Sequence, residues 1–189
     1  MTGKTHRTIG LAFGVGYFLI SAKPEYQPAT LFAVVGASYL GSLIPDADDA
    51  GADIWHTIPL GHSVGKISDP FLKHRNISHS LVGVGVYTII VYTLLRAMPS
   101  YWAISIFPVL ISSAIAYLSH LLADAFTVEG IPIFWPWKRN FGLPPKPFDG
   151  ARIETGKWFE NLLVFPLANI LLLVLIFSNW QKIKELILK

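Results

Sequence analysis

The sequence contains no cysteine and little charge. Without cysteine there is no disulfide framework and no thiolate metal site, so any bound metal must use nitrogen and oxygen ligands. Charged residues make up only 14% of the 189 residues, whereas 52% are hydrophobic and the mean hydropathy is +0.49. This balance predicts an integral membrane protein. The net charge of +3 is small and its basic residues are scattered, so no nucleic acid is expected as a partner.

Five apolar runs are candidates for membrane-spanning helices, each of which needs roughly 20 mostly apolar residues. The runs are 8–22, 29–44, 80–98, 101–122 and 159–180. They predict an all-α polytopic membrane protein with about five transmembrane helices in a single domain over residues 1–189, with a kink at Pro108. A signal peptide is the competing interpretation of the first run, because Lys4 and Arg7 precede its apolar stretch.

Histidine and aspartate residues gather at particular ends of these runs. A chain that crosses a membrane repeatedly returns the start of its first span, the end of its second, the start of its third and the end of its fourth to one face. The residues that this counting places at one membrane face are His6, Asp46, Asp48, His74, His79, His120 and Asp124. The sequence therefore predicts a polar metal site at that face, to which distant parts of the chain contribute.

The local spacing of these residues suits metal binding. His120 and Asp124 are four residues apart, which places both on one face of a helix. Asp46 and Asp48 follow Pro45, where alternate side chains point the same way if the chain is extended. Imidazoles beside carboxylates favour zinc, manganese, iron or magnesium, and the ligands alone leave that choice open.

Each motif also has a simpler interpretation when it is taken alone. The stretch "PDADD" is typical of a turn that stops a helix. His120 and Asp124 alone would be explained by a hydrogen bond between them that satisfies the end of a helix. Ser78 is expected to cap the third helix, with His79 in its first turn and His74 in the preceding loop. Ionisable residues at the membrane are nevertheless functional candidates by default, and their shared side favours a metal site.

The order of four motifs resembles a known family. "THRTIG", "LIPDADD", "HRNISHS" and "SHLLADAFTVEGIPIFWPW" resemble the motifs of YdjM-like (LexA-regulated) inner-membrane metal-dependent hydrolases, over most of the chain through about residue 137. A more distant similarity, in ligand types and order only, is to zinc-dependent phospholipase C and the S1/P1-type nucleases. Those enzymes use an N-terminal amino group and a ligand spacing that do not map onto this sequence. The resemblance implies a metal-dependent hydrolase.

Together, the residues and the resemblance predict a membrane-bound enzyme that hydrolyses phosphoesters with metal-activated water. One to three divalent ions are expected, zinc first, with manganese, iron and magnesium as alternatives, and two ions would share a bridging aspartate. Asp48, Arg75 and Glu154 are the candidate catalytic residues. Arg75 would bind a phosphate oxygen, or else anchor the chain at the headgroups, and Glu154 would be a ligand or base, or else a plain loop carboxylate.

The expected substrate is a phospholipid or an isoprenoid phosphate, because a site at headgroup level meets amphiphiles by lateral diffusion. Most of the 15 lysine and arginine residues lie on the site side, and Lys4 and Arg7 precede the first run while only Lys23 follows it, so the site is expected to face the cytoplasm across the inner membrane. The alternatives are a non-catalytic accessory protein stabilised by metal and a metal-ion transporter. A transporter would place its ligands near the bilayer midplane, where these runs carry almost no charge.

Overall fold

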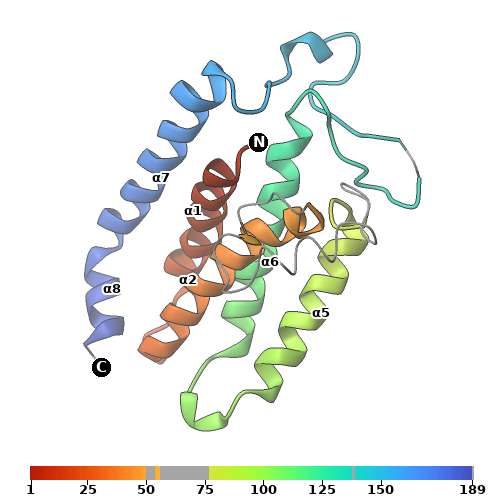
Figure 1. The fold of residues 1–189 in the computed structure, drawn as a ribbon. Coiled ribbons are helices and arrows are strands. Elements are labelled where there is room, and N and C mark those ends of the chain that lie inside the picture. Colours follow the sequence, from red (N-terminus) through yellow and green to blue (C-terminus); the bar gives the residue numbers. More distant parts are fainter. Residues whose placement is uncertain (50–53, 56–76, 138, 189) are drawn as a thin grey trace.

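The computed structural model describes residues 1–49, 54–55, 77–137 and 139–188 (Figure 1). His74 and Arg75 lie outside the described residues. The α-helices in the described part are α1 (Gly3–Ser21), α2 (Pro28–Leu43), α5 (Leu81–Ala97), α6 (Ile106–Ala125), α7 (Phe165–Ser178) and α8 (Trp180–Ile187). Short 3-10 helices occupy η1 (Ile44–Asp48), η2 (Ser100–Trp102) and η3 (Asp149–Ala151), and a π-helical turn forms η4 (Glu160–Val164). The predicted all-α class is confirmed.

Three of the helices form a closely packed centre. Helix α6 packs against α1, α2 and α5, while α1 also packs against α2 and α7. Figure 1 accordingly shows α7 and α5 on opposite sides of the group formed by α1, α2 and α6. The first helix is therefore an interior element of the bundle, although its sequence is not the most apolar.

Glycines explain how closely α1 approaches its neighbours. A Cβ on Gly14 would lie 2.8 Å from the carbonyl oxygen of Ser112 in α6 and would overlap the side chain of Ser38 in α2. At Gly10 the same atom would overlap the side chain of Ser42. Only glycine permits these contacts, and the small serines opposite complete them, as expected for close packing of membrane helices.

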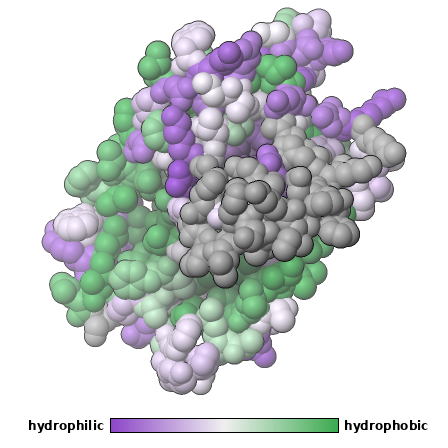
Figure 2. Space-filling view, in the orientation of Figure 1, coloured by the Kyte–Doolittle hydropathy of each residue, from purple (hydrophilic) through white to green (hydrophobic). Residues whose placement is uncertain are grey.

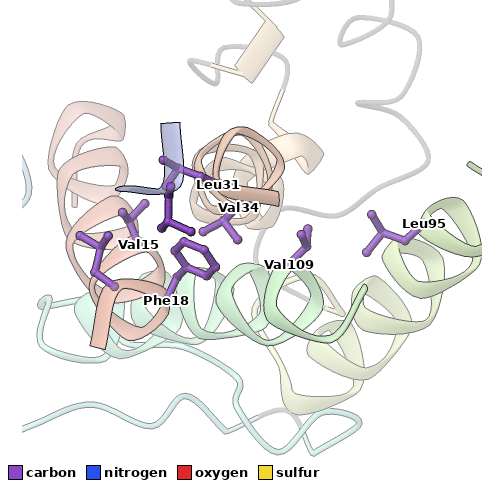
Figure 3. Packing of buried hydrophobic residues seen from close by; sticks show 8 residues of the cluster. Val15, Phe18, Leu31, Val34, Leu95 and Val109 are labelled. Carbon is purple, nitrogen blue, oxygen red and sulfur yellow. The ribbon is translucent and has the colours of Figure 1, made fainter. Parts of the chain in front are cut away.

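The apolar core lies among α1, α2 and α6 (Figure 3). Phe18, Leu19 and Val34 are completely buried, and Val109 contributes from α6. Each such side chain stabilises a fold by about 1.5–3 kcal/mol when it moves from water in the unfolded chain to the core. Lys182 of α8 donates a hydrogen bond of 2.6 Å to the carbonyl of Leu19, so α8 closes the α1 end that lies away from the residue clusters described below.

Within the described residues, three helical stretches are long and apolar enough to cross a membrane, judged by length and composition: Pro28–Asp48, Ile106–Ala125 and Glu160–Ser178. Helix α5 is apolar but has only 17 residues, and α1 carries Lys4, His6 and Arg7 in its first two turns. Three of the five expected spans are thus supported, and membrane crossing by α1 and α5 stays a prediction. Figure 2 shows hydrophobic surface over the helices on the visible face and hydrophilic surface near the 126–159 connection.

The structure corrects several local expectations. Pro108 lies in the first turn of α6 and not in a helix interior, so its missing amide hydrogen costs no helical hydrogen bond, which removes the reason for expecting a kink. Ser80, not Ser78, caps α5, because its hydroxyl accepts a hydrogen bond from the amide of Gly83 at 3.2 Å, and His79 precedes the helix. The chain after Pro45 is a 3-10 helix instead of an extended segment.

Candidate metal centre

Four side chains from separate parts of the chain meet at one end of the bundle. They come from η1, from the residue before the α5 cap, and from the last two turns of α6: Asp46, His79, His120 and Asp124. One ligand atom from each lies within 4.8 Å of every other. His79, His120 and Asp124 are buried, whereas the side chain of Asp46 is 20% exposed. We call these four residues the His/Asp cluster.

The separations within the His/Asp cluster match those between ligands of one metal ion. Asp46 Oδ1 lies 3.4 Å from both His79 Nε2 and His120 Nε2. Asp124 Oδ2 lies 3.5 Å from His79 Nε2 and 3.8 Å from His120 Nε2. These distances exceed the usual 2.7–3.2 Å of a hydrogen bond. Four donors held ~2.0–2.2 Å from a tetrahedral centre are about 3.3–3.6 Å apart, which is close to what the cluster has.

Backbone and hydroxyl contacts fix the orientation of both imidazoles. His120 Nδ1 lies 2.7 Å from the carbonyl oxygen of Ser42, which can only accept, so Nδ1 carries the proton and the lone pair of Nε2 faces the cluster. That Nε2 is buried and makes no hydrogen bond within the described part of the chain. A buried polar atom without a hydrogen bond is costly, and a cation at this place would satisfy it.

His79 is oriented through a serine. The hydroxyl of Ser78 donates to Asp48 Oδ2 at 2.6 Å, and its oxygen lies 3.0 Å from His79 Nδ1. Since the hydroxyl proton is used on Asp48, the oxygen accepts from Nδ1–H, and Nε2 is directed to the cluster. Tyr117 supports this arrangement by donating a 2.5 Å hydrogen bond to the carbonyl of Ser78.

Asp124 presents its two oxygens in different directions. Oδ2 faces His79 and His120, whereas Oδ1 lies 3.1 Å from Nε2 of His6 and also contacts the amino group of Met1. The His6 ring stacks on His120 with its centroid 3.6 Å away. His6 therefore borders the His/Asp cluster through Asp124 and extends its group of possible donors.

The carboxylates of the His/Asp cluster change the pKa of His79. Burial lowers the pKa of this imidazole, but its contacts with Asp124 and Asp46 raise it by more, so that the pKa of His79 reaches about 8. The imidazole is thus charged near neutral pH when only the protein's own groups surround it. A divalent cation, which needs the neutral imidazole, must displace this proton.

The sequence predicted seven ligands, and the structure brings four of them together with His6 beside them. Asp48 is buried but turns to Ser78, because residues two apart do not share a face in a 3-10 helix. Glu154 is exposed in the connection before η4, and it is not among the four residues of the cluster. The predicted roles of His74 and Arg75 lie outside the described residues.

Glu160 is a buried carboxylate that the sequence analysis did not single out. Its Oε1 accepts hydrogen bonds from the amide of Thr2 at 2.7 Å and from the hydroxyls of Thr2 and Thr5 at 2.6 Å each. Its Oε2 accepts from the amide of Gly156 at 2.7 Å. Glu160 thereby fixes the start of α1, which carries His6, against η4. The available signal was an acidic residue at the start of an apolar run on the site side.

The fold and the cluster define a class: an all-helical membrane protein with a buried group of imidazoles and carboxylates at one end of its bundle. The chain belongs to the YdjM inner membrane protein family, whose model matches residues 1–183. It is an inner membrane protein, and the family resemblance of its motifs is confirmed.

Individual relatives agree with this assignment. The chain is 29% identical to the inner membrane protein YdjM of Escherichia coli (strain K12) over 147 residues, which are 76% of this chain and 70% of that protein. It is 28% identical to YvsG of Bacillus subtilis (strain 168), described as uncharacterized, over 166 residues, which are 87% of this chain and 88% of that protein. No solved structure matches the chain.

Proposed function

We propose that this protein is a metal-dependent hydrolase of the inner membrane that cleaves phosphoesters of membrane amphiphiles. The observation that carries the proposal is the His/Asp cluster, whose four imidazole–carboxylate distances are 3.4–3.8 Å and whose four donor atoms all lie within 4.8 Å of one another. Two imidazoles with two carboxylates at tetrahedral separations favour zinc, with manganese, iron and magnesium as alternatives. The cluster is formed by segments far apart in sequence, as the counting of membrane crossings predicted.

A divalent ion held there would supply a Lewis acid and lower the pKa of water to near neutrality. Asp46 is the candidate ligand that reaches solvent, since its side chain is 20% exposed. Asp124 faces His6 with one oxygen and the imidazoles of the cluster with the other, which supports a bridging role if a second ion binds. Both features favour a reactive site over a sealed one.

Asp48 is a positioning residue in this proposal. It holds Ser78, which in turn orients His79. Arg75, next to His74, is proposed to bind a phosphate oxygen. Glu154 is proposed as a further ligand or base, because it lies in the 126–159 connection on the site side. The site is proposed to face the cytoplasm, as the basic residues of the site side favour.

A non-catalytic accessory protein is the second candidate. Four protein donors already complete a tetrahedral shell, and closed four-ligand zinc sites are structural in most proteins. In that case the ion would serve to hold η1, the start of α5 and the end of α6 together.

Hydrolysis by purified, metal-stripped and zinc-reloaded protein tests the proposal. Zinc-dependent release of phosphorylated product from phosphatidylglycerol vesicles or from bis(p-nitrophenyl) phosphate is expected. Asp124→Asn should abolish the activity, whereas Ser119→Ala, a neighbouring change on α6 outside the cluster, should preserve it. Tight zinc binding with no turnover of either ester would favour the accessory protein.

A further inference from the structure

An apolar groove of about 850 Å³ runs between α2 and α5 over the surface of α6. Helices α2 and α5 both pack on α6 but make little direct contact with each other, and the groove lies between them. Its lining includes Ala33 and Ala37 of α2 and Ile90 and Leu94 of α5. The volume falls within the roughly 300–1,000 Å³ typical of ligand pockets.

Among the described residues of the lining, the one charged group is the carboxylate of Asp48, which lies at the end next to the His/Asp cluster. There the groove is lined by Asp48 and Ser78, which hydrogen-bond to each other at 2.6 Å. Ser78 in turn contacts His79, so the groove and the cluster share a wall. At the other end the lining ends at Met98 and is apolar. The groove therefore has the polarity of an amphiphile, with its polar end at the candidate metal site.

The length of the groove fits one hydrocarbon chain. From Gly83 to Met98 the α5 wall extends about 22 Å at 1.5 Å per residue, which is more than one leaflet but less than the roughly 30 Å hydrocarbon core. An extended acyl chain of this length would lie along the apolar lining from Met98 to Asp48 and Ser78.

We propose that this groove binds one acyl chain of a membrane phospholipid and presents the phosphate group to the His/Asp cluster. The inference rests on the proposed function only for the fate of the phosphate, because binding of the chain can be measured without turnover. Ile90 is the most informative position. Its side chain lines the groove and is 52% exposed, so a larger residue there fills the groove without crowding the core.

The test uses full-length protein in vesicles of phosphatidylcholine that contain phosphatidylglycerol with a diazirine in one acyl chain. Cross-links are expected on α2 and α5. Ile90→Trp should reduce them by roughly tenfold, the effect of losing about two buried methylenes. Ile89→Trp is the matched control, since Ile89 is the adjacent residue, 67% exposed and absent from the lining, and should change the yield less than about twofold.

A third variant, Leu118→Trp, fills a second apolar groove of about 430 Å³ between α1 and α6, where the described lining residues include no carboxylate. If the cross-links are lost in Leu118→Trp and not in Ile90→Trp, or map outside α2 and α5, the proposal is overturned.

Two hydrolysis assays separate this inference from the proposed function. With phosphatidylglycerol as substrate, Ile90→Trp should lower kcat/KM by roughly tenfold, while hydrolysis of bis(p-nitrophenyl) phosphate stays unchanged. Equal rates of lipid hydrolysis by Ile90→Trp and Ile89→Trp would refute lipid binding in the groove and leave the proposed hydrolase activity unaffected. Cross-links in the groove without hydrolysis of either ester would support the lipid-binding site and refute the proposed hydrolase activity.

Discussion

Replacing His120 by alanine is the change whose effect can be followed most closely from the structure. This imidazole is completely buried and held by Ser42, with Nε2 3.4 Å from Asp46 Oδ1. Its removal takes away one of four candidate donors without altering the other three. The expected result is weaker zinc binding with a fold that still forms, because the cavity is lined by other polar groups of the cluster.

The size of the effect can be worked out by linkage. Zinc at 100 times its dissociation constant stabilises the native protein by about 2.7 kcal/mol. Loss of an outer partner of a ligand weakens metal binding by about 10–100-fold, so loss of the ligand itself should reach at least ~100-fold. The same zinc concentration then half-saturates the variant and stabilises it by only about 0.4 kcal/mol. For a chain of this size the zinc-induced rise in Tm should fall from about 5–11 °C to about 1–2 °C.

Thermal unfolding in detergent, with and without zinc, measures this difference. Ser119→Ala is the matched control on the same helix, because the Ser119 hydroxyl bonds within α6, to the carbonyl of Ala116. It should retain the full zinc-induced rise in Tm. A His120→Ala variant that keeps the wild-type rise would refute the assignment of this residue as a ligand.

Three further outcomes are expected. Zinc affinity should increase as the pH rises through about 8, because the raised pKa of His79 means that a proton must leave before a cation binds. Titration calorimetry measures this affinity, and a value independent of pH between 6 and 9 would contradict the prediction. Glu160→Gln should lower Tm in zinc-free protein by roughly 3–12 °C, since hydrogen bonds to a buried charge are worth about 1.5–3 kcal/mol; an unchanged Tm would show that these bonds are dispensable. Gly14→Ala should lower Tm by roughly 2–12 °C through overpacking against Ser38 and Ser112, and a stabilised variant would show that α1 can move away from them.

The position of the cluster at one end of the helix bundle could be predicted, because it depends only on successive helices running in opposite directions. His79 precedes one helix and His120 lies near the end of the next, and antiparallel helices bring those ends together. The i, i+4 spacing of His120 and Asp124 also follows from helical geometry, and both side chains do face the cluster.

Details that depend on short segments could not be predicted in this way. The direction of Asp48 follows from a 3-10 turn after Pro45, and both an extended chain and a tight turn are compatible with the motif. Glu160 acquires its partners Thr2 and Thr5 only through tertiary packing. The groove between α2 and α5 depends on how these two helices pack on α6 with little contact between them, a property that no local pattern encodes.

X-ray absorption spectroscopy of the protein loaded with one equivalent of zinc tests the central claim most directly, namely that remote helix ends form one coordination sphere. The account predicts four nitrogen and oxygen donors at ~2.0–2.2 Å, with the outer-shell scattering of two imidazoles. That scattering should vanish in the double variant His79→Ala, His120→Ala. A wild-type spectrum without imidazole, or an identical spectrum from the double variant, would contradict it.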